Sequence, residues 1–120
     1  MTRYLELPQA VGILEDLGLH VRDIGLLASA LARPSSSMFG VEAYATIEIK
    51  AASLLSSLSQ NEPLFDGNKR FSWIMTTTFL ELNGVLVDMD LGTAFDLVLS
   101  AAQSKASLDE IAEAFRAHTR

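Results

Sequence analysis

The stretch Asn61-Glu62-Pro63-Leu64-Phe65-Asp66-Gly67-Asn68-Lys69-Arg70 decides how this chain is interpreted, and an apolar helical pattern follows it at once. Backbone N–H groups at the start of a helix have no partners and carry partial positive charge, so they attract anions. Lys69 and Arg70 add full charges, and a guanidinium can bond two phosphate oxygens at once. A helix start with this chemistry favours phosphate binding.

Two neighbours of these cations strengthen the prediction of a phosphate site. Asn68 can donate hydrogen bonds to oxygen. The Asp66 carboxylate is a hard oxygen ligand of the kind that Mg²⁺ takes when it also holds phosphate. Without its flanks, Asp-Gly-Asn is ordinary turn chemistry and Lys-Arg is common on surfaces. A plain turn before a solvated helix start is therefore the alternative.

Apolar spacing predicts helices over most of the chain. The expected helices cover about 8–17, 24–31, 42–58, 67–83, 91–99 and 107–115. Asn83-Gly84 is a good C-terminal stop, and Ser107 begins a capping box with Glu110. The helix at 67–83 is apolar on several sides, which indicates a buried central helix. Short extended pieces at 3–7 and 85–87 are too few for a sheet-based domain. The expected fold is a compact all-α bundle of about six helices.

Length and composition limit the class of protein. A chain of 120 residues is most simply one domain, expected here over residues 1–120. It has no Cys, and its two imidazoles, His20 and His118, are far apart in sequence, so a zinc site is not expected. The net charge of −6 disfavours nucleic acid as a partner. No apolar run approaches the ~20 residues of a membrane span and no signal-peptide pattern is present, which predicts a cytoplasmic protein without a membrane partner.

The stretch at 61–70 resembles the signature of the Fic/Doc family, His-x-Phe-x-(Asp/Glu)-Gly-Asn-(Gly or Lys)-Arg. Four positions match, and Lys69 is the choice of the Doc (death-on-curing) branch; the matching residues are Asp66, Gly67, Asn68 and Arg70. Glu62 stands where the family has its catalytic His, and Leu64 stands at the Phe position. The Fic branch has a second Arg where this chain has Trp73. The resemblance extends from about residue 14 to about residue 99, and it implies the helical fold of that family.

The resemblance implies a role for each residue of the signature. Asp66 would help to hold Mg²⁺ on the phosphates of ATP, and Gly67 and Asn68 would form the anion cradle. Lys69 and Arg70 would clamp the phosphates. The catalytic positions would be 62, 66 and 70, occupied here by Glu62, Asp66 and Arg70. ATP and Mg²⁺ are the cofactors that this implies.

Three functions are compatible with the resemblance and with the positions at which this chain differs from the family signature. Doc enzymes belong to toxin–antitoxin pairs and transfer the terminal phosphoryl group of ATP to a threonine of elongation factor Tu. This implies an antitoxin and a translation factor as partners. Fic enzymes instead transfer AMP to a protein hydroxyl, and Lys69 and Trp73 argue against that alternative. A third alternative is a module that binds nucleotide or antitoxin without catalysis.

Glu62 leaves three interpretations open, because the family His acts as the general base toward the target hydroxyl. Glu62 can be an engineered inactivating change, the mark of a natural degenerate member, or a working substitute base. A carboxylate can accept a proton, but it also places negative charge beside phosphates. Under the first two interpretations, activity is impaired or absent.

Other segments carry weaker predictions. The segment 35–40 corresponds to the flap of the family, which lines a target peptide; Met38 and Phe39 are then either core anchors or target contacts. Lys50 is expected to be solvated, and nothing in the sequence places His20 near the signature. We also expect a hydrophobic groove close to the 33–40 loop and to the start of the helix at 67. It would take an amphipathic helix of an antitoxin, whose basic residues would suit the net charge.

Overall fold

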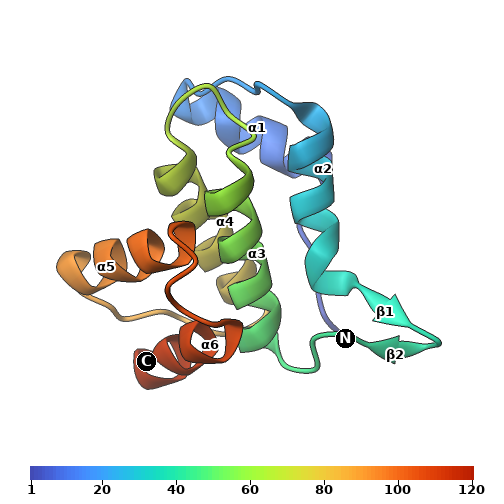
Figure 1. Cartoon of the computed structure of the whole chain (residues 1–120), viewed down its shortest axis with the longest axis vertical. Coiled ribbons are helices and arrows are strands. Elements are labelled where there is room, and N and C mark those ends of the chain that lie inside the picture. Colours follow the sequence, from blue (N-terminus) through green and yellow to red (C-terminus); the bar gives the residue numbers. More distant parts are fainter.

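The computed structural model describes residues 1–120 and shows a compact all-α fold, as predicted (Figure 1). The six helices are α1 (Leu7–Leu17), α2 (Ile24–Ala32), α3 (Ile47–Asn61), α4 (Asn68–Leu82), α5 (Leu91–Ala102) and α6 (Leu108–Ala117). Between α2 and α3 lie the 3-10 turn η1 (Arg33–Ser35) and the strands β1 (Ser37–Met38) and β2 (Val41–Glu42). None of the helices is long and apolar enough to cross a membrane.

Most helix ends lie where local sequence signals place them. The Ser107 hydroxyl accepts from the Glu110 N–H in the predicted capping box. The Ser107 N–H donates in return to Glu110 Oε1 at 2.9 Å, and this bond, together with the Ser107 hydroxyl, holds the pKa of the Glu110 carboxyl below its usual value. The predicted start of the third helix at 42 is wrong. Thr46 caps α3 by accepting from the Ile49 N–H, because the residues around Glu42 pair in a hairpin instead.

The core lies around a central pair of helices, α3 and α4. α3 also packs against α2, α5 and α6. Figure 1 shows α2 on one side of this pair and α5 on the other, with α1 near the upper end and α6 near the lower end. A buried central helix was predicted at 67–83, and α4 does bury six residues. α3 buries ten and is the more deeply enclosed of the two. The first turn of α4 therefore keeps a face that is open to ligands.

The segment predicted as a flap forms a β-hairpin. Met38 pairs with Val41 across a two-residue turn in which Phe39 and Gly40 both have positive φ, 52° and 78°. That geometry matches the right-handed twist of a hairpin. Phe39 is 98% exposed and Met38 is also exposed, which excludes the core-anchor alternative for both residues. Their contact with a target stays a prediction.

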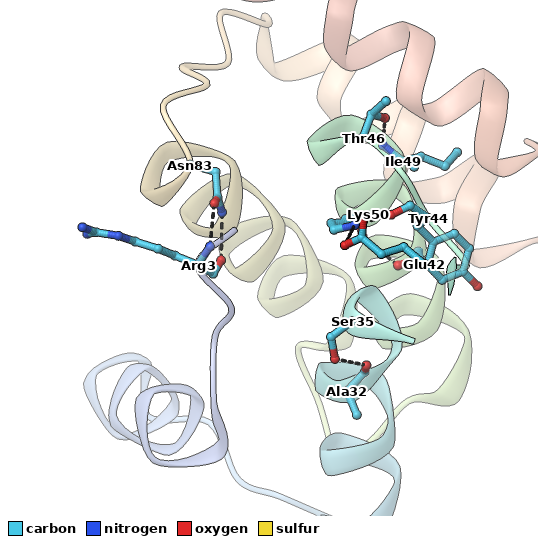
Figure 2. A network of polar contacts seen from close by, with 10 residues as sticks. Arg3, Ala32, Ser35, Glu42, Tyr44, Thr46, Ile49, Lys50 and Asn83 are labelled. Carbon is cyan, nitrogen blue, oxygen red and sulfur yellow. Dashed lines mark hydrogen bonds and ion pairs between the residues drawn. The ribbon is translucent and has the colours of Figure 1, made fainter. Parts of the chain in front are cut away.

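Buried polar contacts hold this hairpin against the first turns of α3. Lys50 is only 1% exposed, and its Nζ donates to Glu42 Oε1 at 3.1 Å and to the Tyr44 carbonyl (Figure 2). Arg33 donates to the Tyr44 hydroxyl and to the Ser57 hydroxyl, both at 2.9 Å. The expectation that Lys50 is solvated was wrong, because the chain before α3 folds back over that side chain.

Removing either member of the Lys50–Glu42 pair should have unequal effects. Glu42→Ala leaves a buried ammonium with one carbonyl partner, whereas Lys50→Met leaves a carboxylate that is 58% exposed and stays hydrated. Removing the partner of a buried charge is the more destabilising of the two changes. We expect the free energy of unfolding to fall by about 2 kcal/mol for Glu42→Ala and by about 1 kcal/mol for Lys50→Met. Urea unfolding followed by circular dichroism measures both, and an equal or reversed order would contradict this view of the pair.

The hairpin and the signature stretch lie at opposite ends of α3. The hairpin contacts Lys50 near the start of α3, and the stretch at 62–67 follows its last residue (Figure 1). α3 has 15 residues, which separates its ends by roughly 20 Å at 1.5 Å per residue. A groove close to both segments, as predicted for the antitoxin, would have to extend along α3, and it stays a prediction.

Candidate functional site

All of the predicted site residues lie in the loop that joins α3 to α4 or in the first turn of α4. Glu62 ends α3 in the left-handed region, with φ 50° and ψ 60°. Gly67 precedes α4 in the same region, with φ 78°. A turn of this kind at each end of the loop lets the chain leave α3 and enter the neighbouring α4 within a few residues.

The side chain of Asn68 fixes the shape of this loop. Its Oδ1 accepts from the Leu64 N–H at 2.9 Å, and its Nδ2 donates to the Leu64 carbonyl at 3.1 Å. An amide nitrogen carries two hydrogens, so one remains for another acceptor. Asn68 therefore closes the loop around buried Leu64 and can still donate to a ligand.

The backbone angles at Gly67 favour glycine, because its φ of 78° lies in the left-handed region. A Cβ placed there would lie 2.9 Å from Leu19 Cδ2, so the end of that side chain would have to shift. Its N–H donates to Asp66 Oδ1 at 2.8 Å, which leaves the second carboxylate oxygen of Asp66 without a protein partner. The glycine lets the loop lie directly on the residues that follow α1.

The start of α4 is built differently from the starts of its neighbours. A side-chain oxygen accepts a backbone N–H at the start of α2, α3, α5 and α6, but no side chain caps α4. The first backbone donor of α4 to be paired is Phe71, so the N–H groups of residues 68–70 have no intrahelical partner. Lys69 and Arg70 are exposed there, and neither takes part in the two ion pairs of the chain. Three unpaired donors and two free cations give this helix start the chemistry to attract an anion.

The two carboxylates beside this site are exposed. Neither the Asp66 nor the Glu62 side chain takes part in an ion pair, and the Glu62 carboxylate accepts no hydrogen bond. No group of three His, Cys, Asp or Glu side chains could hold a metal ion. Mg²⁺ keeps water and phosphate ligands and needs only one or two carboxylates. Asp66 therefore suits an ion that arrives with a nucleotide, and the residues would not hold one alone.

A groove between α4 and α5 opens beside the two cations. It has a volume of about 510 Å³, and its lining residues are Lys69, Arg70, Trp73, Ile74, Leu91, Ala94, Phe95 and Val98. Leu91 is 86% and Phe95 62% exposed, although both were predicted only as part of the apolar stripe of the fifth helix. Spacing along one helix could not reveal the groove, because α4 forms its other wall. An apolar slot with charge at one rim suits a ligand that is apolar at one end and anionic at the other.

The connector between α1 and α2, residues 18–23, forms backbone hydrogen bonds with the signature loop, residues 62–67. The Phe65 N–H donates to the His20 carbonyl at 3.1 Å, and the Pro63 carbonyl accepts from the N–H groups of Arg22 and Asp23 at 2.7 and 3.0 Å. His20 therefore lies beside the signature through its backbone, although nothing in the sequence indicated this. Sequence reasoning missed the connector because no motif marks a backbone contact.

Comparison with known proteins agrees with this geometry. The family model described as the Fic/DOC family matches residues 4–80, which include the whole loop and most of α4. A protein described as toxin Doc from Mycolicibacterium smegmatis is 48% identical to this chain over 96 residues, which cover 78% of this chain and 74% of that protein. The family model covers more than half of the chain and the identity to that toxin extends over most of both proteins, so the chain belongs to the Fic/DOC family.

Proposed function

We propose that this chain is a Doc-type toxin of a bacterial toxin–antitoxin pair, which uses Mg-ATP to phosphorylate a hydroxyl of a translation protein of the elongation factor Tu kind. The observation that carries the proposal is the uncapped start of α4, where unpaired N–H groups meet the free cations Lys69 and Arg70. The similarity to toxin Doc supports it. The chain has a net charge of −6, so an anionic ligand is attracted to this local cluster of positive charge rather than to the rest of the surface.

Each residue has a role in the proposed transfer. The N–H groups at the start of α4 and the spare Asn68 hydrogen hold phosphate oxygens, and Arg70 can bond two of them at once. The free oxygen of Asp66 would hold Mg²⁺, which when bound neutralises phosphate charge. Stabilising the charge on the transferred group and positioning it are the main contributions of a protein to phosphoryl transfer. Glu62 occupies the general-base position, and we expect the transfer to be impaired because a carboxylate replaces the family imidazole there.

Two alternatives differ in what happens after the nucleotide binds. Transfer of AMP is disfavoured, because the long cation Lys69 fills space that this pose would need. A binding module without catalysis is favoured by one observation: no neighbour orients the Glu62 carboxylate. ATP labelled on the γ- or on the α-phosphate separates the three functions when it is incubated with a purified translation factor. We expect label transfer from the γ-position alone, most clearly in a variant with an imidazole at 62. Transfer from the α-position would establish the AMP transferase, and binding without transfer in either protein would establish the module.

We further propose that the base of the nucleotide lies in the α4–α5 groove. Trp73 and Phe95 offer aromatic surface there, and Lys69 and Arg70 stand where the groove meets the phosphate site. A base stacked on an aromatic side chain contributes roughly 1–3 kcal/mol. The groove then selects a nucleotide over an inorganic phosphate chain.

Phe95→Ala should weaken Mg-ATP binding about fivefold, because a half-exposed ring gives the lower end of the stacking range. Affinity for tripolyphosphate, which has no base, should stay unchanged. Trp73 is the only tryptophan and lines the groove, so its fluorescence reports binding directly. Phe39→Ala removes an exposed ring at the other end of α3 and is the matched control. Equal affinities of wild type and Phe95→Ala for ATP would place the base elsewhere.

The partners of the proposed toxin are an antitoxin and its translation-factor target, without nucleic acid or membrane, in the cytoplasm. The exposed hairpin residues Met38 and Phe39 are proposed as contacts for one of these proteins. The groove beside Lys69 and Arg70 is locally positive, so it would repel the basic antitoxin segment that the net charge of the chain favours. We therefore propose that such a segment binds elsewhere on the surface. The whole chain is proposed to form one Fic/Doc-like domain.

A further inference from the structure

The end of α3 lacks the backbone closure that the other long helices have. At the ends of α4 and α5 the cap residue donates its N–H to carbonyls of the last turn, as in most helices. The Glu62 N–H makes no backbone hydrogen bond, and Pro63, which follows, has no N–H to donate. No basic residue lies in the last turn of α3 to take their place. The final carbonyls of α3 therefore need a donor from elsewhere in the chain.

Arg22, in the connector after α1, supplies that donor. Its Nε donates to the Glu62 carbonyl at 3.1 Å, and its Nη2 reaches the same carbonyl and the Asn61 carbonyl, the latter at 3.4 Å. A cation at this end of a helix also complements the helix dipole. The Arg22 N–H donates to the Pro63 carbonyl at 2.7 Å, so one residue holds three successive carbonyls.

These contacts fix the backbone of residue 62 and leave its side chain free. Arg22 bonds the carbonyls of 61–63 on one side, and the Asn68 amide bonds Leu64 on the other. A residue other than glycine costs about 1 kcal/mol or more in the left-handed region, and it stays there only where its surroundings impose it. The guanidinium contacts the carbonyl of Glu62 and not its carboxylate. Arg22 thus fixes the backbone position from which the side chain of residue 62 extends, and it makes no hydrogen bond to that side chain.

We propose that Arg22 is a positioning residue for the proposed transfer: it holds position 62 in the left-handed conformation that presents the proton acceptor to the phosphate site. The inference rests on the proposed function for what the side chain at 62 does. The placement of the loop by Arg22 follows from the contacts alone. A residue that only capped α3 would affect stability and nucleotide binding together, whereas a positioning residue affects the chemical step.

The first experiment needs no activity. Amide hydrogen exchange is compared between the chain and its Arg22→Met variant, which keeps the apolar stem and removes the donors. Arg22 is exposed, so the variant is expected to fold. We expect the Leu64 and Phe65 amides to exchange about tenfold faster, with Met75 in the core of α4 unchanged. Arg3→Met removes an exposed arginine whose side chain makes no hydrogen bond and is the matched control. Unchanged protection at Leu64 and Phe65 would overturn the inference.

The second experiment separates positioning from stability, in a Glu62→His background that restores the family base. We expect Arg22→Met to lower kcat about tenfold and to leave the Kd for Mg-ATP within twofold. Arg22→Lys, which keeps a charged donor, should restore part of kcat. A rise in Kd that matches the loss of kcat, or no rescue by Lys, would show a merely structural role. If Glu62→His transfers no phosphoryl group, the proposed function fails, and hydrogen exchange alone still decides whether Arg22 places the loop.

Discussion

Glu62→His is expected to raise phosphoryl transfer to the target protein by roughly 10²–10⁴-fold, the usual contribution of a positioned general base. The physical reason lies at the end of α3. Residue 62 is held in a left-handed turn, its backbone is bonded by Arg22, and its side chain is exposed, in the loop that leads to the uncapped start of α4. An imidazole there would accept the proton of the target hydroxyl without adding a negative charge beside the phosphates. Initial rates with γ-labelled ATP measure the gain.

Two variants make this result specific to the base. Glu62→Gln removes the carboxylate charge but offers no basic group, so it should not gain the activity that His gives. Asp66→Asn in the His background should lose most of it, because the proposed Mg²⁺ ligand is weakened. Full transfer by the chain as it stands, unchanged by Glu62→His, would falsify the assignment of position 62 and would make Glu62 a working base.

Arg70→Ala should weaken Mg-ATP binding by ten- to a hundredfold, since a charge-assisted hydrogen bond contributes ~1.5–3 kcal/mol. Arg70 is exposed and forms no ion pair, so this loss should come without a loss of stability. Asn68→Ala should weaken binding to a similar degree for a different reason. It removes a donor and also the two bonds to Leu64 that shape the loop. Isothermal calorimetry gives both affinities.

The two variants should differ in their melting temperatures. Arg70→Ala is expected to melt at the same temperature as the wild type. Asn68→Ala should melt at a lower temperature, because the buried backbone N–H and carbonyl of Leu64 lose their hydrogen-bond partner. Lys105→Ala removes an exposed cation far along the chain from the site and is the control for net charge. Nucleotide affinity that is unaltered in both Arg70→Ala and Asn68→Ala would reject the start of α4 as the anion site.

Local signals in the sequence predicted the helices well, because a cap or a stop acts within a few residues. Ser107 with Glu110 and the Asn83-Gly84 stop are examples, and both ends lie where expected. The position of the candidate site at a helix start could also be predicted, since its donors and cations are contiguous in the chain. The start of α3 could not, because the hairpin pairing of Glu42 competes with helix formation there.

What escaped prediction depends on contacts between distant segments. The sequence predicts Lys50 as a surface residue, but in the structure Tyr44 and Glu42 lie over its side chain. Phe95 lies in the apolar pattern predicted at 91–99, yet it is 62% exposed because α4 and α5 leave a groove between them. Arg22 carries no motif, and its role appears only when the connector lies against the signature loop.

The pairing of the connector with the signature loop has a consequence for folding. Arg22 and Glu62 are 40 residues apart in the chain, so their contact closes a long loop and adds to the contact order of the fold. The loop at 62–67 takes its final shape only once the connector between α1 and α2 has docked on it. During synthesis, the nascent segment up to residue 70 would hold every residue of the signature while the core still lacked Phe115 of α6, which stacks on Trp73. A potentially harmful activity in such a chain would arise only as a late step of folding.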